Sequence, residues 1–262
     1  MIKNIITKFS GNPFIQKILE KNITFSLYLV GVGSNGCVED SGEKVVLNLL
    51  TSNDKPYCIF DVGANKGQYL NMVFNEFSKK NFEIHSFEPS KYTFDLLKKN
   101  SPESTKVKLN NLGLGENDGE FTLYYDELGS GLASLTKRKL DHFSISFNNS
   151  EKIRVITLDN YCLQSSIKHI HLLKLDVEGH EMDVLKGSIK MFAAQSIDVV
   201  TFEFGGCNID TRSFFRDFYY FFKEQKMNLF RITPSGYLFP IEKYREQYEQ
   251  FKNTNFVATK IA

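Results

Sequence analysis

The stretch that decides the fold is 57-YCIFDVGANKGQYL-70. Residues 57–61 are aromatic and apolar up to a final carboxylate, which predicts a short buried strand. Residues 63–67 form a glycine-punctuated turn, and the apolar spacing over residues 68–77 is helical. Glycines let a ligand approach the main chain, and the N–H groups at a helix N-terminus point outward. The stretch therefore predicts a ligand cradle between a strand and a helix.

A second predicted strand, residues 82–87, ends in Glu88 about twenty residues after the turn. An acidic residue at this position suits the ribose hydroxyls of a nucleotide held by a βαβ unit. On the turn alone, a plain strand-to-helix connection with glycines for geometry is the alternative. The flanking strand, the helix and Glu88 together favour a nucleoside site.

The residues of the turn indicate which nucleoside. A dinucleotide fingerprint has three glycines, whereas this turn has Asp61 directly before it. A carboxylate there repels phosphate and attracts an ammonium group. S-adenosylmethionine carries an ammonium, a sulfonium and a ribose but no phosphate, so the turn favours this cofactor over NAD. The candidate cofactor-binding residues at these two strand ends are Asp61, Gly63, Ala64, Asn65, Gly67, Glu88 and Pro89.

Composition limits the protein class. A chain of 262 residues fits one α/β domain, residues 51–262, behind an N-terminal helical extension, residues 1–50. A net charge of +1 gives no field that favours nucleic acid. The four cysteines are scattered, which predicts reduced thiols in a cytoplasmic protein and no zinc or other metal site. No apolar run approaches the roughly 20 residues of a membrane span, and no signal peptide is apparent.

The N-terminal extension begins with an apolar helical face over residues 2–19. Packing on the domain or on a second copy of the chain is favoured over an interfacial contact with a membrane. Asp40 and Glu43 have the spacing of a capping box that opens a further helix. Capping is the favoured role of Glu43, and a place beside the cofactor pocket is the alternative.

A third strand is expected over residues 107–112. At its end, Asn111 and Gly113 lie where an adenine ring would bind, although Asn111 equally suits a role in holding a turn. Two alternating stretches, 121–125 and 153–158, predict strands on either side of a long polar loop, which either caps a site or is disordered. The Lys-Arg-Lys run at 137–139 predicts a solvated face, with an acidic substrate group as the alternative ligand.

A second chemical centre lies in 171-HLLKLDVEGHEMDVLKG-187, an apolar strand followed by a helix that begins near Gly179. Asp176, Glu178, His180 and Glu181 crowd the turn between them. Ligands bind at the carboxyl ends of strands in open α/β sheets, so these residues are expected to face the cofactor. Helix capping by Asp176 and Glu178, with the other two exposed, is the alternative. The next strand, residues 197–204, carries Glu203 near its tip, and Lys174 is its candidate partner.

Near the C-terminus, five phenylalanines at helical spacing predict a core-facing helix over residues 214–222. Strands follow over 229–232, 236–241 and 256–261, with a polar helix over 242–251. An antiparallel final hairpin on a mostly parallel sheet fits this order.

Taken together, the motifs resemble those of the FkbM-type S-adenosylmethionine-dependent methyltransferases from Gly33 onward. The resemblance rests on S-G-E (41–43), D-V-G-A-N-K-G (61–67), S-F-E-P (86–89), N-L-G-L-G (111–115) with D-G-E (118–120), G-L-A-S-L (131–135), T-L-D-N-Y (157–161), K-L-D-V-E-G-H-E (174–181), L-K-G (185–187) and F-E (202–203). Leu112-Gly113 departs from the small apolar pair expected there. The resemblance implies a class I, Rossmann-like methyltransferase domain: a doubly wound, mostly parallel seven-stranded sheet with an antiparallel last strand. It also implies methyl transfer to an oxygen, such as a sugar hydroxyl in a glycan, glycolipid or natural product.

The expected chemistry is in-line displacement at a methyl group, which needs an aligned acceptor oxygen and a base for its proton. His180 is the candidate base because an unperturbed imidazole titrates near neutrality, with Asp176 or Glu178 as alternatives. Metal assistance through Asp176, Glu178 and Glu203 is less favoured. A non-catalytic cofactor-binding protein and an NAD-dependent oxidoreductase are the competing classes.

Overall fold

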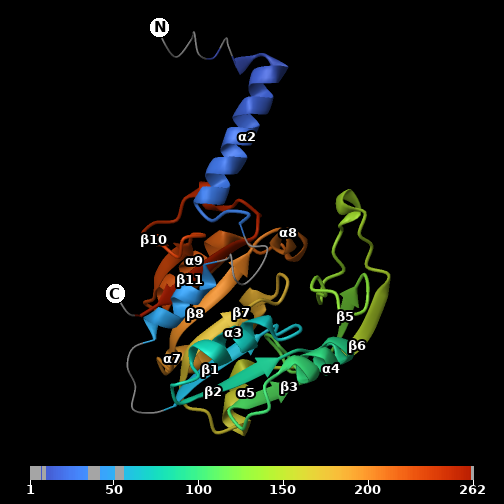
Figure 1. Cartoon of the computed structure of the whole chain (residues 1–262), viewed down its shortest axis with the longest axis vertical. Helices are drawn as coiled ribbons and strands as arrows, with labels where there is room; N and C mark the ends of the chain where they lie inside the picture. Colours follow the sequence, from blue (N-terminus) through green and yellow to red (C-terminus); the bar gives the residue numbers. More distant parts are fainter. Residues whose placement is uncertain (1–6, 8–9, 35–41, 51–55, 261–262) are drawn as a thin grey trace.

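A computed structural model gives the structure of residues 7, 10–34, 42–50 and 56–260. Within these residues the central sheet has eight strands in the order β10-β9-β11-β8-β7-β1-β2-β3 (Figure 1). The strands are β1 (Tyr57–Val62), β2 (Phe82–Phe87), β3 (Val107–Asn110), β7 (Ile170–Leu175), β8 (Ile197–Phe204), β9 (Asn228–Ile232), β10 (Leu238–Pro240) and β11 (Thr254–Thr259).

The order and direction of the strands confirm the expected architecture. Strands β3, β2, β1, β7 and β8 are parallel neighbours, and β11 runs antiparallel between β8 and β9. The expected seven strands are joined by an eighth, because the three residues of β10 pair antiparallel with β9 at the sheet edge. Parallel neighbours need crossover connections, so both faces of the sheet are covered.

Two apolar clusters lie on the two faces of the sheet. One face packs against η1 (Glu43–Leu49), α3 (Gln68–Glu76) and α4 (Lys91–Asn100). The other packs against α5 (Leu158–Gln164), α6 (Glu181–Lys186), α7 (Ile189–Ala193) and α9 (Phe215–Glu224). The predicted core role of the phenylalanine helix is confirmed for Phe215, Phe218 and Phe222, which are fully buried, whereas Phe214 is exposed.

A second, three-stranded sheet stands beside the first. It consists of β4 (Gly113–Leu114), β5 (Gly119–Tyr125) and β6 (Asn149–Ile156), in the order β4-β6-β5. Residues 126–148 connect β5 to β6 and include the short η2 (Asp141–Phe143). We call this connection the arm; Figure 1 shows it in light green, rising beside the central sheet.

The N-terminal part differs from the expectation in two ways. Helix α2 (Pro13–Leu29) projects away from the domain and has no buried residue, so packing on the domain is not observed along it (Figure 1). Segment η1 is a 3-10 helix that follows Gly42 without a side-chain cap, and its Val46 and Leu47 belong to the domain core. Asp40 and residues 2–6 lie outside the described residues. Among the described helices, none combines the length and apolar content that a bilayer span requires.

The polar helix predicted over residues 242–251 is wrong. The structure has only a 3-10 turn, η3 (Glu246–Tyr248), in this segment. The carboxylate of Glu249 accepts hydrogen bonds from the backbone N–H groups of Phe215 and Arg216 at 2.8 and 3.0 Å. The segment therefore supplies a hydrogen-bond acceptor for the N–H groups in the first turn of α9. This tertiary contact outweighs the local helical tendency of residues 242–251.

Gly63 provides a test of how closely the end of β1 packs against the residue that follows β7, Asp176. It has φ +81°, and a Cβ at this position would lie 1.8 Å from the carbonyl oxygen of Asp176. We expect Gly63→Ala to lower the free energy of unfolding by at least about 2 kcal/mol, measured by urea denaturation. Gly206→Ala is the matched control, since its added methyl group would meet nothing nearer than 3.8 Å. Equal stability of both variants would contradict this packing.

Candidate functional site

A buried ion pair lies at the carboxyl end of β1 and β7. Asp61 and Lys174 are paired neighbours on the two strands, and both side chains are buried. The Lys174 Nζ atom lies 3.5 Å from Asp61 Oδ1 and 3.1 Å from Asp176 Oδ2. Burial alone would lower the pKa of Lys174. The carboxylates of Asp176 and Asp61 raise this pKa by more than burial lowers it, so the ammonium stays charged. The expected partner of Lys174 was Glu203, and its ion pairs in the described structure are instead with these two aspartates.

The glycine turn and Glu88 form one hydrogen-bonded unit. Glu88 accepts a hydrogen bond from the N–H of Asn65 at 3.1 Å and another from the N–H of Ser90 at 2.9 Å. Asn65 has a left-handed backbone, with φ 48°, and its buried Oδ1 atom has no hydrogen-bond partner. The absence of a side chain at Gly63 is explained by the Asp176 carbonyl packed against it, rather than by the approach of a ligand.

The turn between β7 and α6 is shaped by two consecutive left-handed residues, Glu178 (φ 52°) and Gly179 (φ 98°). The buried carboxylate of Glu181 accepts hydrogen bonds from the N–H groups of Val177 and Gly179 at 3.0 and 3.2 Å. This geometry places His180 directly before the helix, with its side chain 14% exposed. The alternative in which His180 and Glu181 are exposed is therefore wrong.

These two turns meet at one cavity of about 190 Å³. Its wall includes eight of the predicted site residues: Gly63, Asn65, Glu88, Pro89, Gly113, Asp176, Glu178 and His180. Glu203 also reaches the wall. Residues distant in the sequence thus converge at the carboxyl ends of the parallel strands, as expected for an open α/β sheet.

Five predicted cofactor-binding residues are not part of the cavity wall. Asp61 is fully buried against Lys174, and Ala64 and Gly67 lie within the turn. Asn111 donates hydrogen bonds from Nδ2 to the carbonyl groups of Glu88 and Pro89 at 2.9 and 3.0 Å, so it holds a turn. Glu43 lies on the ion-pair side, where its carboxylate contributes to the raised pKa of Lys174.

Sequence reasoning did not identify the wall that comes from the arm and the second sheet. The arm contributes Ser130, Gly131, Ala133, Ser134 and Leu135, and the second sheet contributes Leu114, Leu123, Ile153 and Val155. The loop was expected to cap a site or to be disordered, and its length was the only signal. The arm is fixed to the opposite side of the cavity, because Ser134 Oγ donates a hydrogen bond to the carbonyl of Glu178 at 2.9 Å.

The Lys-Arg-Lys run is not a uniformly solvated face. Arg138 has a side chain that is 8% exposed, and its Nη1 donates to Glu178 Oε2 at 2.6 Å. Its Nε lies 3.6 Å from Asp210 Oδ2 on α8 (Cys207–Thr211). Arg138 therefore ties the arm to the β7–α6 turn and to α8, which leaves it committed within the protein rather than free for an acidic substrate group.

Three carboxyl groups of the wall, those of Glu88, Glu178 and Glu203, have a raised pKa. Burial raises the pKa of Glu88 to about 7, against the opposing hydrogen bonds from Ser90 and Asn65. Burial and the charge of Asp176 raise the pKa of Glu178 to about 8, against Arg138. The pKa of Glu203 is also raised, mainly by burial. Such perturbed carboxyls gathered in a cavity are typical of a functional site.

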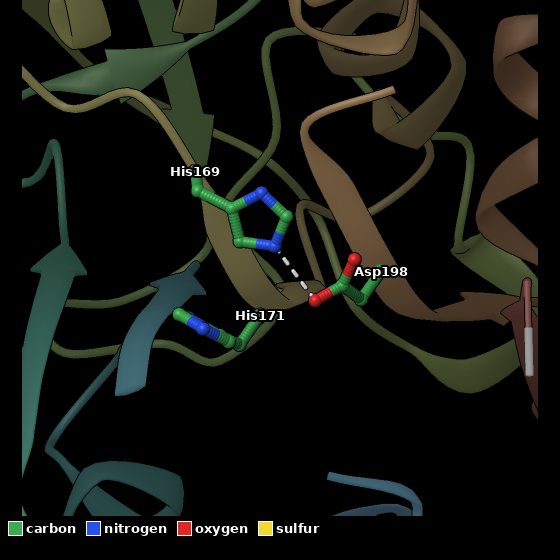
Figure 2. A group of neighbouring side chains, drawn as sticks. All are labelled: His169, His171 and Asp198. Atoms are coloured by element: carbon green, nitrogen blue, oxygen red, sulfur yellow. Dashed lines mark hydrogen bonds and ion pairs between the residues drawn. The ribbon is translucent and has the colours of Figure 1, made fainter. Parts of the chain in front are cut away.

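A separate group of three possible metal ligands lies at the opposite, amino-terminal end of the strands. Figure 2 shows His169, His171 and Asp198, with His169 Nε2 2.7 Å from Asp198 Oδ2. The His171 Nδ1 atom accepts a hydrogen bond from the N–H of Cys58 at 2.9 Å, so the proton of the neutral ring is on Nε2. Burial lowers the pKa of His171 and favours this neutral ring. A metal would need the lone pair at Nε2, so hydrogen bonding, rather than ligation, accounts for this group.

The cavity suits S-adenosylmethionine on three observations. The wall carries four carboxyl groups, those of Glu88, Asp176, Glu178 and Glu203, whose oxygens can accept hydrogen bonds from an ammonium or a ribose hydroxyl of this cofactor. The unpaired Oδ1 of Asn65 can accept a hydrogen bond there. Apolar side chains from β4, β5 and β6 offer a surface for an adenine ring.

Comparison with known proteins finds similarity to methyltransferases. A model of the FkbM methyltransferase domain matches residues 61–228. The hexuronic acid methyltransferase AglP of Haloferax volcanii is 30% identical over 165 residues, which is 62% of this chain and 62% of that protein. Methyltransferase 1 of Beauveria bassiana is 26% identical over 144 residues, 49% of this chain and 57% of that one. The crystal structure of an FkbM methyltransferase from Methylobacillus flagellatus has a TM-score of 0.47 at 15% identity, and the match covers 80% of this chain and 45% of that one. Because the family model covers more than half of the 262 residues, the chain belongs to the FkbM methyltransferase family.

Proposed function

We propose that the chain is an O-methyltransferase that transfers the methyl group of S-adenosylmethionine to a hydroxyl of a sugar in a glycan, glycolipid or natural product. The observation that carries the proposal is the single cavity in which the glycine turn and Glu88 face His180 and Glu178. One side has the groups expected for a nucleoside cofactor, and the other has the groups expected for proton transfer from an acceptor.

The cofactor half of the proposal assigns roles to four wall residues. Glu88 would accept hydrogen bonds from the ribose hydroxyls, since each of its oxygens has one lone pair left beyond its backbone donor. Asn65 Oδ1 and the carboxylate of Asp176 would hold the amino-acid part. Gly113, which has no side chain, would lie against the adenine ring together with the apolar side chains of the wall. When bound, the cofactor supplies an electrophilic methyl carbon whose bond to sulfur breaks as the acceptor oxygen attacks.

The acceptor half depends on His180 as the base. An alcohol is a poor nucleophile until its proton leaves, and imidazole is suited to take it near neutral pH. Asp176 and Glu178 are ion-paired with Lys174 and Arg138, so their negative charge is already compensated within the protein. This compensation favours His180 over either carboxylate as base, and it disfavours a divalent metal at these oxygens.

The proposal of a sugar acceptor is supported by the name of one relative rather than by the cavity. The relative from Haloferax volcanii is named as acting on hexuronic acid, and its matched part spans less than two thirds of its own length. The protein's net charge of +1 offers no field for a nucleic-acid acceptor.

The three described cysteines are free thiols, which supports a reducing, cytoplasmic setting. We extend the proposal to helix α2 as an exposed extension that is available to a second copy of the chain, whereas η1 belongs to the domain core rather than to the separate extension expected over residues 1–50.

Asn65→Gly tests the cofactor half. Glycine suits the backbone at φ 48°, so the free energy of unfolding should fall by no more than about 1 kcal/mol. Loss of the amide should weaken binding of S-adenosylhomocysteine by about 5- to 30-fold in titration calorimetry. Ser144→Gly, at φ 58° and outside the wall, is the control. Unchanged affinity in Asn65→Gly, or binding of NAD instead, would contradict the assignment.

His180→Ala tests the acceptor half. We expect turnover to fall by about 100-fold or more, with binding of S-adenosylhomocysteine kept, because the proton acceptor is lost. Asp176→Asn should also lower turnover, through the loss of its bond to Lys174. Transfer of tritium from labelled S-adenosylmethionine to fractionated glycan or lipid of the source cell is the measurement. His142→Ala, an exposed histidine of the arm, is the control. Near-normal turnover in both site variants would show that the base is elsewhere.

The labelled product tests the kind of acceptor oxygen. A methyl ether on a sugar hydroxyl resists mild alkali, whereas a methyl ester on a uronic acid carboxylate releases labelled methanol. We expect the label to stay on the glycan. Release of methanol would replace the hydroxyl with a carboxylate as the acceptor, while methyl transfer itself would stand.

A further inference from the structure

Both ring nitrogens of His180 contact side chains that are not part of the cavity wall. Nδ1 lies 2.7 Å from Asp183 Oδ2, and Nε2 lies 3.0 Å from Thr136 Oγ1. Asp183 lies on the first turn of α6, three residues after His180, where side chains of a helix meet. Thr136 lies on the arm, directly after the wall residues Ser134 and Leu135.

We infer that Asp183 is a positioning residue that keeps the His180 proton on Nδ1, and that the Thr136 hydroxyl occupies the place of the acceptor hydroxyl at Nε2. The inference rests on the proposed function and deepens it, because it names the acceptor as an alcohol that displaces a protein alcohol. It assigns no direct contact with substrate to Asp183.

The role of Asp183 follows from donor and acceptor chemistry. An ionised carboxylate only accepts hydrogen bonds, so the ring nitrogen that faces it must carry the proton. The neutral ring then has its lone pair on Nε2, which is the basic form required of a proton acceptor. Lys186 Nζ lies 3.9 Å from Asp183 Oδ1. Charged groups near this side of the cavity also include Glu178, paired with Arg138, Asp176, paired with Lys174, Glu203 of the wall, and Glu116, which lies 3.3 Å from Lys186 Nζ.

The role of Thr136 follows from the likeness between its side chain and a sugar. Threonine is a secondary alcohol, as are most ring hydroxyls of a sugar, so it presents the same O–H donor to the Nε2 lone pair. The site thus already holds a secondary alcohol at hydrogen-bond distance from the base. A carboxylate acceptor has no proton with which to replace this hydrogen bond.

The step that this arrangement serves is a proton transfer. The O–H bond of the acceptor breaks and an N–H bond forms at Nε2, while the oxygen keeps the electron pair with which it takes the methyl group. The imidazolium that results carries a proton on each nitrogen and is stabilised by Asp183. Release of the Nε2 proton to water restores the starting ring.

Asp183→Asn tests the positioning role with a readout that does not need activity. In ¹⁵N NMR of the protein without added ligands, with the His180 signal assigned through His180→Gln, we expect the wild type to show the Nδ1–H tautomer. In Asp183→Asn we expect loss of that single tautomer, a fall in kcat of about 10- to 100-fold, and an acidic limb of the pH–rate profile that moves to lower pH. Asp95→Asn, which breaks an i,i+3 pair with Lys98 on α4, is the matched control.

Thr136→Val removes the hydroxyl and keeps the shape of the side chain. We expect a lower KM for the acceptor and an undiminished kcat, because the acceptor no longer competes with Thr136. A fall in kcat as large as that of His180→Gln would place Thr136 in the proton path and overturn its role as a placeholder. An Nε2–H tautomer in the wild type would overturn the positioning role. Failure of the proposed function alone would appear as the expected tautomer together with no methyl transfer to any alcohol.

Discussion

The contact of Lys174 with Asp61 and Asp176 is the constraint on which the site depends. Its ammonium joins two strands and a turn, because it also donates to the carbonyl of Gly63 at 3.4 Å. Burying these charges costs free energy that their attraction only partly offsets, so the contact is better understood as fixing geometry than as adding stability. It holds the glycine turn against the β7–α6 turn, which sets the distance between the two halves of the cavity.

The second half of the wall is held by an equivalent arrangement of one cation and two carboxylates. Arg138 of the arm pairs with Glu178 and Asp210, and Ser134 donates to the Glu178 carbonyl. Lys174 and Arg138 are therefore both paired with carboxylates of the protein itself. The remaining acidic groups on the wall can meet a cationic cofactor, and the chemistry is left to the alignment of an acceptor and the removal of one proton.

The two sides of the cavity are built from different kinds of structure. The cofactor side is built from strand ends and tight turns, whose backbone is fixed by the sheet. The side that the proposed function assigns to the acceptor includes the arm, a connection between two strands of a small separate sheet. A connection of this kind can change its sequence and length without disturbing the central sheet, so the arm is where differences in acceptor are expected to be located.

The sequence by itself determined the order of strands and helices, the glycine turn, Glu88 and the crowded turn at 176–181, because each depends on contacts between near neighbours or on a fixed periodicity. It did not determine that Asp61 would pair with Lys174 rather than face the cofactor, that Asn111 would hold a turn, or that residues 242–251 would leave the helical state to serve α9. It also did not reveal the arm as a wall, or Asp183 and Thr136 as partners of His180. Most of these depend on which side chains the fold brings together from distant parts of the chain, as Thr136 with His180 and Asp61 with Lys174 show, whereas Asp183 lies only three residues after His180. A buried polar group takes whichever partner the tertiary structure offers, because leaving it unpaired costs more than any local preference.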